Sequence, residues 1–376
     1  MKSVLYLLSA LCMLLCGCAK SEFKRELKGV LAEATTRYNA LAVDVEKGER
    51  GYPYAFSGGE LLSAEGKNVW ASGYFPGSLW MLAEWNDDDA MRETAQVLAY
   101  KLNGRLRGAN LHDFAMVVNA AHAKIYKKRE TIRAMEAMDM VARASSNTFS
   151  RVYRTMENLE GDAEYYHRTA VWNIPTMEFL YELGWTGNVN IHAESVMNSH
   201  VREDGAVYEG MIYNKYTSEL IEPFSLHGMS ATSAWSRGQA WALYGFTMLY
   251  RISEEKAYLE QAERTAKYIM SQLQIDGIPN WDFDSKDELK DSSAAAIMAS
   301  AFVDLYALTQ NEEYLLTAER QLATLISQEY KAGDDCGGLL LKHGVGNRMT
   351  GEEVDAALIY GDYYLIEAIV KYLEVV

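Results

Sequence analysis

The stretch that decides the fold is Thr232-Ser-Ala-Trp-Ser-Arg-Gly-Gln-Ala-Trp-Ala-Leu-Tyr-Gly245. Ser236 followed three residues later by Gln239 is the pattern of a capping box, so we expect a helix to begin at Ser236. Apolar side chains then recur at helical spacing, at Trp241, Tyr244, Met248 and Leu249. This spacing predicts that one face of the helix packs against a core.

Arg237 falls in the first turn of this predicted helix. A cation there is unfavourable by about 0.3–1 kcal/mol, because the helix dipole is already positive at that end. The cost is tolerable where an anion lies between the guanidinium and the free backbone N–H groups. Trp235 and Trp241 flank the same spot and are suited to stack on a sugar. The alternative is structural, with Arg237 paired to an acidic neighbour and both tryptophans in the core.

The first residues of the chain have the features of an export signal. A basic start is followed by an apolar run that ends in Leu15-Cys16-Gly17-Cys18. These four residues resemble a bacterial lipobox, so we expect removal of residues 1–17 and lipidation of Cys18. A membrane span is the alternative, but it needs about 20 apolar residues and this run is shorter. We therefore expect an exported bacterial lipoprotein, periplasmic or anchored in the outer membrane, that contacts the membrane only through the lipid on Cys18.

Composition narrows the classes of function. The formal net charge is −16, which gives no support to nucleic-acid binding. A small anionic substrate is still compatible, because the local field of a pocket can oppose the global charge. Three of the four cysteines belong to the export signal, which leaves Cys336 without an intramolecular partner. No metal-ligand spacing, phosphate loop or nucleotide fingerprint is present, so we expect no metal and no cofactor.

Helical periodicity recurs through most of the chain, over about 22–47, 76–86, 89–106, 112–126, 128–146, 167–182, 187–200, 237–253, 255–273, 292–309, 311–329 and 362–375. No linker or low-complexity tract divides these segments, so residues 18–376 are predicted to form one domain. Short loops make neighbouring helices antiparallel, in a solenoid or in a closed ring. No repeat of fixed period is visible, which weakens the solenoid. The longest departure from helix is 201–235, where 206–213 is predicted as a short hairpin or long loop.

The segment from Trp235 to Gly245 resembles the signature of the unsaturated glucuronyl hydrolases, glycoside hydrolase family 88, and of the related unsaturated rhamnogalacturonyl hydrolases. Further matches follow in the family's order, among them Trp281-Asp-Phe-Asp284, Lys290-Asp-Ser-Ser-Ala-Ala-Ala296 and Tyr360-Gly-Asp-Tyr-Tyr364. Together the matches cover nearly the whole chain after the signal. The resemblance implies an all-α fold, an (α/α)6 barrel of paired antiparallel helices, with its site at one end.

The resemblance also implies site residues in the first third of the chain. Trp70-Ala-Ser-Gly-Tyr-Phe-Pro-Gly77 looks like a family segment whose first Trp lines the sugar pocket, so Trp70 inherits that role with Tyr74 nearby. His112 and Asp113 match a His-Asp pair whose Asp contacts the reacting sugar and is required for activity. Considered without the family, Asp113 is also a good helix cap, and such a cap is worth about 1 kcal/mol.

At one position the sequence departs from the family in a way that affects the chemistry. The family's general acid/base Asp stands four residues before the Asn of an Asn-Leu-Pro-like turn, and counting back from Asn173 gives Thr169. A Thr hydroxyl does not titrate near neutral pH, so it cannot replace a carboxyl as proton donor. Asp162 and Glu164, on the preceding loop, could reach inward, but their spacing does not show that they do.

A second departure lies in 201–235. The family's pocket His aligns near Glu209, and His227 falls where the family has a substrate-contacting Gln. Two altered polar positions beside a retained Trp and Arg framework favour a changed substrate or mechanism.

We therefore predict a carbohydrate-active hydrolase that removes a terminal 4,5-unsaturated uronic acid from acidic oligosaccharides. Asp113 is the predicted catalytic residue, and the predicted substrate contacts are Trp70, Tyr74, His112, Thr169, Glu209, His227, Trp235, Arg237 and Trp241. In the family the vinyl ether is protonated and hydrated, so one acid/base group can suffice where ordinary glycosidases use two carboxylates. Two alternatives stay open: a diverged glycosidase acting on a saturated uronide, and a sugar-binding homologue without catalysis, which Thr169 keeps in view.

Overall fold

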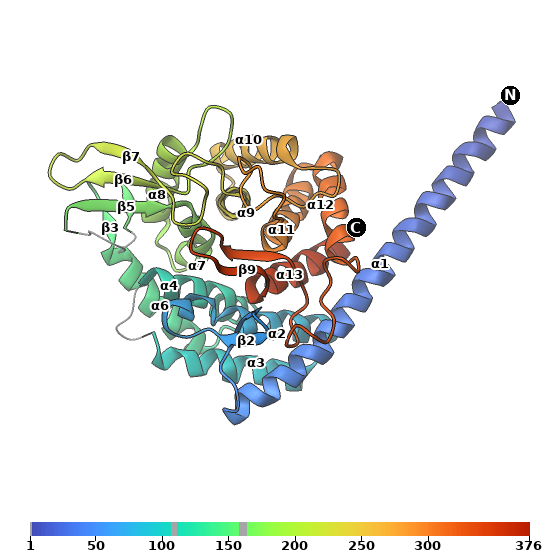
Figure 1. Ribbon diagram of the computed structural model, residues 1–376, viewed down its shortest axis with the longest axis horizontal. Helices are drawn as coiled ribbons and strands as arrows, with labels where there is room; N and C mark the ends of the chain where they lie inside the picture. Colours follow the sequence, from blue (N-terminus) through green and yellow to red (C-terminus); the bar gives the residue numbers. More distant parts are fainter. Residues whose placement is uncertain (1, 107–110, 158–163) are drawn as a thin grey trace.

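The computed structural model describes the backbone of residues 2–376 except 107–110 and 158–163, and side chains from residue 20 onward except 107–113 and 158–163. Helices dominate this part of the chain and alternate between an outer and an inner layer (Figure 1). The outer helices are α1 (Lys2–Lys47), α3 (Asp89–Lys101), α6 (Ile132–Asn147), α8 (Thr186–His200), α10 (Lys256–Gln272) and α12 (Glu312–Leu325).

The inner helices form a closed ring. They are α2 (Tyr74–Asn86), α4 (Leu111–Val117) continued through a π-helical turn into α5 (Ala123–Arg129), α7 (Met177–Glu182), α9 (Ser236–Ser253), α11 (Ser292–Thr309) and α13 (Ile359–Val375). Helix α9 packs on α7 and α11, α11 packs on α13, and α13 packs back on α2. The predicted (α/α)6 barrel of paired antiparallel helices is therefore confirmed.

Burial distinguishes the two layers. Every residue of α9 from 236 to 249 is buried, whereas α10 buries only a stripe at helical spacing that includes Tyr258, Ala262 and Ile269. Helix α11 is long and apolar enough to cross a membrane by length and composition, but 72% of that 18-residue window is buried inside the protein. Its apolar character is thus accounted for by its place in the core.

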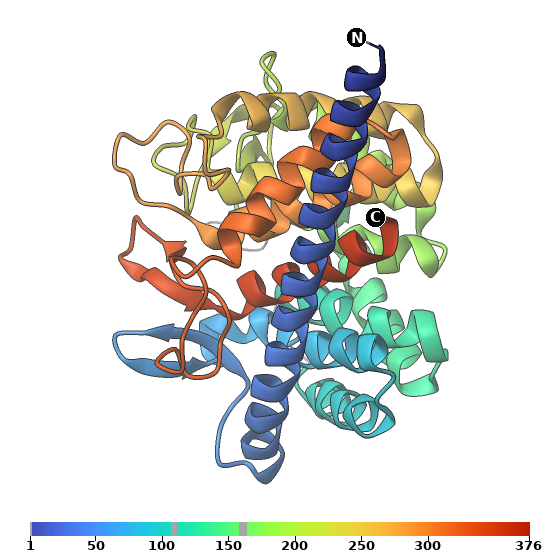
Figure 2. The ribbon, with the colours of Figure 1, turned by 90° about the vertical axis from the view of Figure 1, so that its right-hand side faces the viewer.

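The connections at the two ends of the barrel differ. Each turn from an inner to an outer helix is tight, and at four of them a non-glycine residue adopts a left-handed conformation, with φ of 52° at Asp87, 31° at Glu130, 59° at Glu254 and 59° at Gln310. The connections from outer to inner helices are long. Figure 2 shows these long segments and their strands projecting on one side of the molecule. A site built from the long connections therefore lies at the end where the inner helices begin.

Strands in these long connections form three small sheets. Strands β1 (Pro53–Ser57), β2 (Glu60–Ser63), β8 (Gly344–Asn347) and β9 (Glu352–Leu358) form one sheet in the order β2-β1-β9-β8. Strands β5 (Tyr166–Ala170), β6 (Gly210–Asn214) and β7 (Leu220–Phe224) form the second, and β3 (Phe149–Ser150) pairs with β4 (Thr155–Met156) in the third. Because β1 pairs with β9, segments about 300 residues apart in sequence meet at the same end of the barrel.

The structure corrects three local predictions. Residues 167–170, predicted as the start of a helix, belong to β5, because the pairing of β5 with β6 satisfies their backbone groups. Residues 206–213, predicted as a short hairpin or long loop, are a loop up to residue 209 and then enter β6, whose hairpin with β7 extends to Phe224. Helix α9 does begin at Ser236, but without a capping box: the Ser236 hydroxyl donates to the carbonyl of Trp281 at 2.9 Å.

Gln239, the other member of that predicted capping box, connects α9 to the loop before it. Its amide exchanges two hydrogen bonds with the backbone of Val207, each of 2.7 Å. The polar residues that look like helix-capping signals therefore attach the long connection 201–235 to the barrel.

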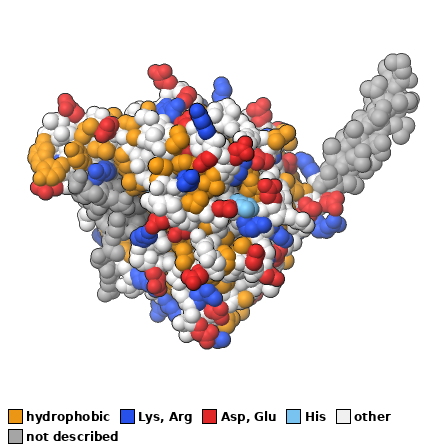
Figure 3. All heavy atoms as spheres, viewed as in Figure 1, with side chains coloured by type: hydrophobic (Ala, Val, Ile, Leu, Met, Phe, Trp, Pro, Cys, Tyr) orange, Lys and Arg blue, Asp and Glu red, His pale blue; other side chains and the backbone are white. Residues whose placement is uncertain are grey.

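The N-terminal end of α1 projects away from the body of the protein (Figure 1). The side chains of residues 1–19, including Cys18, lie outside those that the structure describes, so the export signal and the lipid anchor stay predictions. Figure 3 shows acidic and basic side chains interspersed over the face seen in Figure 1, with hydrophobic side chains gathered at the outer end of the β5–β7 sheet. Exposed apolar residues there include Tyr165, Tyr216, Leu220 and Ile221.

Candidate active site

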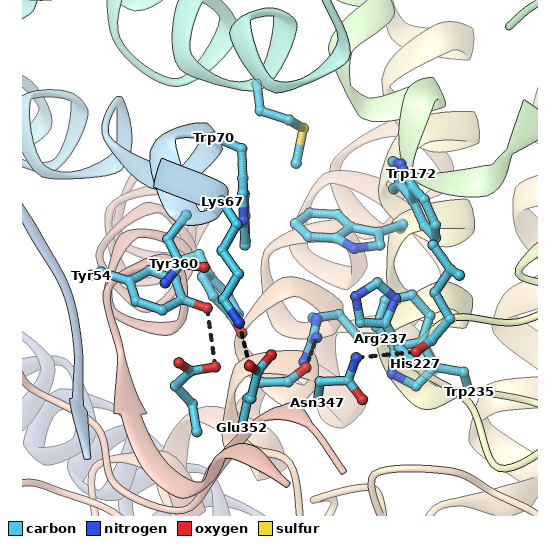
Figure 4. Close-up of a pocket in the computed structure, with 16 residues that line it drawn as sticks. Tyr54, Lys67, Trp70, Trp172, His227, Trp235, Arg237, Asn347, Glu352 and Tyr360 are labelled. Carbon is cyan, nitrogen blue, oxygen red and sulfur yellow. Dashed lines mark hydrogen bonds and ion pairs between the residues drawn. The ribbon is translucent and has the colours of Figure 1, made fainter. Parts of the chain in front are cut away.

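A cavity of about 360 Å³ lies at the end of the barrel where the inner helices begin. Its lining is rich in aromatic and charged side chains, drawn in Figure 4. The lining residues are Tyr54, Lys67, Asn68, Trp70, Met116, Trp172, Leu226, His227, Trp235, Arg237, Trp241, Gly346, Asn347, Glu352, Glu353 and Tyr360. Five predicted site residues are among them, although their contacts with a substrate stay predictions.

Aromatic rings face each other across the cavity. Trp70 stands on one side and Trp172 on the other (Figure 4). Trp70 is held edge-on by Tyr54, with ring centroids 6.3 Å apart, and by Tyr74, at 6.0 Å. Tyr74 itself is buried and is not among the residues that line the cavity, so its contact with substrate stays a prediction. It supports the ring that does reach the cavity.

His227 and Glu209 form a hydrogen-bonded pair at the Trp172 side. The His227 Nδ1 atom lies 2.6 Å from Glu209 Oε1, and the imidazole stacks on Trp235 with centroids 4.6 Å apart and planes at 14°. His227 lines the cavity, whereas Glu209 is buried behind it. Glu209, predicted as a substrate contact, therefore orients His227 in this structure.

Arg237 lies at the floor of the cavity in a buried ion pair. Its Nη1 donates to Asp291 Oδ2 at 3.0 Å and to the carbonyl of Val345, and its Nη2 donates to the carbonyl of Gly346 at 2.7 Å. The guanidinium also lies 4.7 Å from the ring of Trp235, within the range of a cation–π contact. Much of its hydrogen-bonding capacity is thus used within the protein, and its predicted contact with a substrate anion stays a prediction.

Two adjacent carboxylates of β9 border the cavity beside a lysine. Lys67 forms an ion pair with Glu352, and the Tyr54 hydroxyl donates to Glu353 Oε2 at 3.3 Å. Burial raises the pKa of Glu353, and the charge of Glu352 raises it further. The cavity therefore holds both a cation that is exposed to solvent and a carboxyl that protonates more readily than usual.

Thr169 does not border the cavity. It lies on β5, fully buried, and its hydroxyl has no hydrogen-bond partner among the residues that the structure describes. The predicted substrate contact of Thr169 stays a prediction. In this structure no proton donor occupies its position.

The structure describes only some of the remaining candidates for the acid. His112 and Asp113 belong to α4, but their side chains lie outside the described residues, and so does the whole of Asp162. Glu164 is exposed two residues before β5 and does not line the cavity. The role of Asp113 therefore stays a prediction that follows from the family.

Sequence reasoning missed the residues contributed by the β1–β2 and β8–β9 sheet and by the turn before α2. Tyr54, Lys67, Glu352 and Glu353 carry no motif, and segment 330–361 has no helical periodicity from which a structure could be predicted. Trp172 could have been found, because it directly precedes the Asn173-Ile-Pro turn on which the count to Thr169 depends. Among the described residues, no group of three His, Cys, Asp or Glu side chains could hold a metal ion.

An (α/α)6 barrel with an aromatic-walled, charged cavity at the open end of its inner helices defines a carbohydrate-active protein of the six-hairpin type. Comparison with known proteins gives the family. The chain is 30% identical to an unsaturated glucuronyl hydrolase of Formosa agariphila over 348 residues, 87% of this chain and 86% of the relative. It belongs to the unsaturated glucuronyl hydrolases, glycoside hydrolase family 88.

Further relatives and a solved structure support the same family. An unsaturated chondroitin disaccharide hydrolase of Streptococcus agalactiae is 25% identical over 88% of both chains. The crystal structure of an unsaturated glucuronyl hydrolase specific for heparin superposes with a TM-score of 0.85 at 27% identity, covering 94% of this chain and 97% of that one. No family model matches the chain. The protein is thus a glycoside hydrolase by family, with a Thr where the family resemblance expects the acid/base Asp.

Proposed function

We propose that this enzyme removes the terminal 4,5-unsaturated uronic acid from acidic oligosaccharides of the kind that polysaccharide lyases release. The observation that carries the proposal is the aromatic-walled cavity, with Trp70 facing Trp172, at the open end of a barrel shared with relatives named for this activity. A cavity of about 360 Å³ is within the usual size of small-molecule sites. It suits one terminal sugar ring with part of the next.

The charges around the cavity favour a substrate without sulfate on the leaving sugar. Among the described lining residues, the cations Lys67 and Arg237 are matched by the anions Glu352 and Glu353. Arg237 is further neutralised by its ion pair with Asp291. A cavity without excess positive charge can accommodate one carboxylate through local hydrogen bonds, but it does not attract a second anion.

The experiment compares three disaccharides with the purified enzyme: unsulfated unsaturated chondroitin disaccharide, its 6-sulfated form, and the saturated form of the unsulfated sugar. Loss of the ultraviolet absorbance of the double bond follows the first two, and chromatography of the released sugars follows all three. We expect the unsulfated unsaturated substrate to be consumed with the highest kcat/KM. We expect the 6-sulfated substrate to be slower and the saturated one inert.

Two results would contradict the proposal. Cleavage of the saturated disaccharide in preference to the unsaturated one would favour a diverged glycosidase. Binding of the unsaturated disaccharide in calorimetry without any turnover would favour a sugar-binding homologue, the alternative that Thr169 raises. A 6-sulfated substrate that outperforms the unsulfated one would overturn only the charge argument.

A further inference from the structure

We infer that His227, positioned by Glu209, is the acid/base group of this enzyme, in place of the carboxyl that is absent at Thr169. The inference rests on the proposed function, because it assigns a residue to that reaction. It follows from the geometry of the pair, from its place beside Thr169, and from the one ring nitrogen that the pair leaves available.

Glu209 is held as an ionised carboxylate. Its Oε2 accepts hydrogen bonds from the Ser225 hydroxyl and from the backbone N–H groups of Leu226 at 3.1 Å, His227 at 3.1 Å and Gly228 at 3.2 Å, which leaves Oε1 for the His227 ring. Burial alone would raise the pKa of Glu209, but the charge of His227 and these hydrogen bonds outweigh burial and lower it. A buried carboxylate with so many donors is suited to orient a partner rather than to transfer a proton.

The partner that Glu209 orients is His227. The 2.6 Å contact between Glu209 Oε1 and Nδ1 assigns the Nδ1 proton, so Nε2 is the nitrogen that gains or loses a proton. No described residue forms a hydrogen bond with Nε2. The ring is fixed by stacking on Trp235 and by an edge contact with Trp172 at 5.5 Å, and its side chain is still 28% exposed where it lines the cavity.

The pair lies beside the position of the absent carboxyl. Ala170, the residue after Thr169, pairs with Gly210, the residue after Glu209. The N–H of Val171 donates to the carbonyl of Glu209 at 2.9 Å. The backbone that carries Glu209 is therefore hydrogen-bonded to the segment from which the family's acid would project. A proton donor lost from β5 is replaced by one held on the neighbouring chain segment.

The proposed step conserves atoms and charge. The protonated His227 transfers its Nε2 proton to C4 of the C4=C5 bond, and the π electrons form the new C4–H bond. The positive charge at C5 is shared with the ring oxygen. Water attacks C5 and returns one proton to Nε2, so the net change is addition of water. The resulting hemiketal opens, and the next sugar leaves from C1 without a further reactant.

Glu353 is the main competitor among the described residues, because it lines the cavity and burial raises its pKa. It lies at the Tyr54 side of the cavity, however, across from Trp172 and His227 (Figure 4). Thr169 and the pair belong to the Trp172 side. Asp113, predicted from the family, contacts the reacting sugar in that family and is compatible with a separate role here.

The test uses His227→Gln and His227→Ala with unsulfated unsaturated chondroitin disaccharide. Gln can still donate a hydrogen bond to Glu209 but cannot transfer a proton, so we expect kcat to fall about 10²–10⁴-fold with little change in KM. In His227→Ala, added imidazole should restore part of kcat in a saturable way, which a purely structural role would not produce. Glu209→Gln should lower kcat at nearly constant KM, because it weakens the orientation of His227.

His343 offers a matched control. Its Nδ1 lies 2.5 Å from Asp355 Oδ1, the same kind of pair, but neither residue lines the cavity. His343→Gln should leave kcat and imidazole dependence unchanged. Where Glu209→Gln does not fold, as judged by circular dichroism, the two His227 variants carry the test.

Turnover by the wild type combined with full activity of His227→Gln would overturn this inference and leave the proposed function intact. Loss of activity in Glu353→Gln, with His227→Ala insensitive to imidazole, would assign the proton to Glu353 instead. A wild type that consumes no unsaturated uronide would overturn the proposed function, and the inference with it.

Discussion

At the scale of single residues, Thr169 occupies the position where the resemblance predicts the family's acid/base Asp. Its side chain is fully buried, and its hydroxyl lacks a partner among the described residues. A carboxylate at this position would lose its hydration. It would gain no hydrogen bond in return, because the Thr169 hydroxyl that it replaces has no donor beside it among the described residues. Introducing an Asp at residue 169 alone is therefore not expected to restore a working acid/base group.

We predict that Thr169→Asp lowers the free energy of unfolding by about 1–3 kcal/mol and does not raise kcat, because the new carboxyl is buried away from the cavity. Thr169→Val is the matched control. It removes only an unpaired hydroxyl, so its stability should equal or slightly exceed that of the wild type. Urea unfolding and turnover of the unsaturated disaccharide measure both. A folded Thr169→Asp variant with clearly higher kcat would show that residue 169 reaches the substrate, and would count against His227.

How far the sequence predicts the site depends on what each residue touches. Two blocks of sequence at or just before the starts of inner helices match the family's spacing. They place four predicted residues at the cavity: Trp70, Trp235, Arg237 and Trp241. Those blocks could not show that Tyr74 lies behind Trp70. A burial order of this kind depends on three-dimensional packing and leaves no pattern along the chain.

At the scale of elements, the tight turns between inner and outer helices share a strained feature. Glu254 ends α9 with φ 59° and ψ 14°, in the left-handed region that glycine adopts at little cost. Its side chain is exposed and makes no hydrogen bond or ion pair with a described residue. The turn imposes the left-handed backbone conformation on Glu254. No contact of the Glu254 side chain with a described residue offsets the conformational strain that a residue with a Cβ atom has there.

Glu254→Gly should therefore raise the free energy of unfolding by about 0.5–1 kcal/mol, since glycine relieves the left-handed strain. Glu260→Gly, at an exposed position inside α10, should lower it by about 1 kcal/mol, because glycine there costs helix propensity. Urea denaturation of the two variants tests the opposite signs. If both substitutions destabilise the protein equally, the left-handed turn is not a strained position.

The helices were predicted far better than the strands, and the reason is the range of the interactions. Helical spacing is a local property, so α10 and α11 were predicted to within about a residue at each end. Strand β1 pairs with β9 from the other end of the chain, and β5 forms only because β6 is beside it. Short strands with distant partners have no local signal to distinguish them from loop or helix.

At the scale of the whole molecule, the end of the barrel opposite the cavity is joined by a closed ring of ion pairs. Lys127 of α5 bonds Glu178 of α7 at 2.6 Å, and Arg251 of α9 bonds Glu178 at 2.8 Å and Asp304 of α11 at 2.7 Å. Lys371 of α13 continues from Asp304 at 2.7 Å. The ring returns to α5 through Glu367 and Lys124.

This ring ties together α5, α7, α9, α11 and α13, while the N-terminal ends of inner helices such as α9 and α13 hold the cavity. The two ends of the barrel therefore differ in how their charged side chains are arranged. The charged groups at one end line the cavity in separate pairs such as Lys67–Glu352, whereas those at the other end form one continuous ring. No motif in the sequence predicts the ring, because every pair except Lys371–Glu367 joins residues on different helices.

Glu178 makes the ring sensitive to acid. Burial alone would raise the pKa of Glu178, but the charges of Arg251 and Lys127 outweigh burial and lower the pKa to about 2. Because the folded pKa lies below the usual value of 4.5, the unfolded chain takes up the proton first as pH falls. The stability that Glu178 contributes is thus fully present above about pH 4.5 and is lost as pH falls toward 2. The shift corresponds to about 3 kcal/mol.

Glu178→Gln should lower the free energy of unfolding by about 3–5 kcal/mol at pH 7, because Arg251 and Lys127 lose a buried counter-charge. It should also remove most of the difference in stability between pH 4.5 and pH 2 that Glu178 gives the wild type. Asp139→Asn, which breaks an exposed pair with Arg143 on α6, is the control and should cost less than about 1 kcal/mol. Urea unfolding across this pH range measures all three proteins. An acid dependence in Glu178→Gln as steep as in the wild type would mean that other carboxylates, Glu367 foremost, set the acid limit of the barrel.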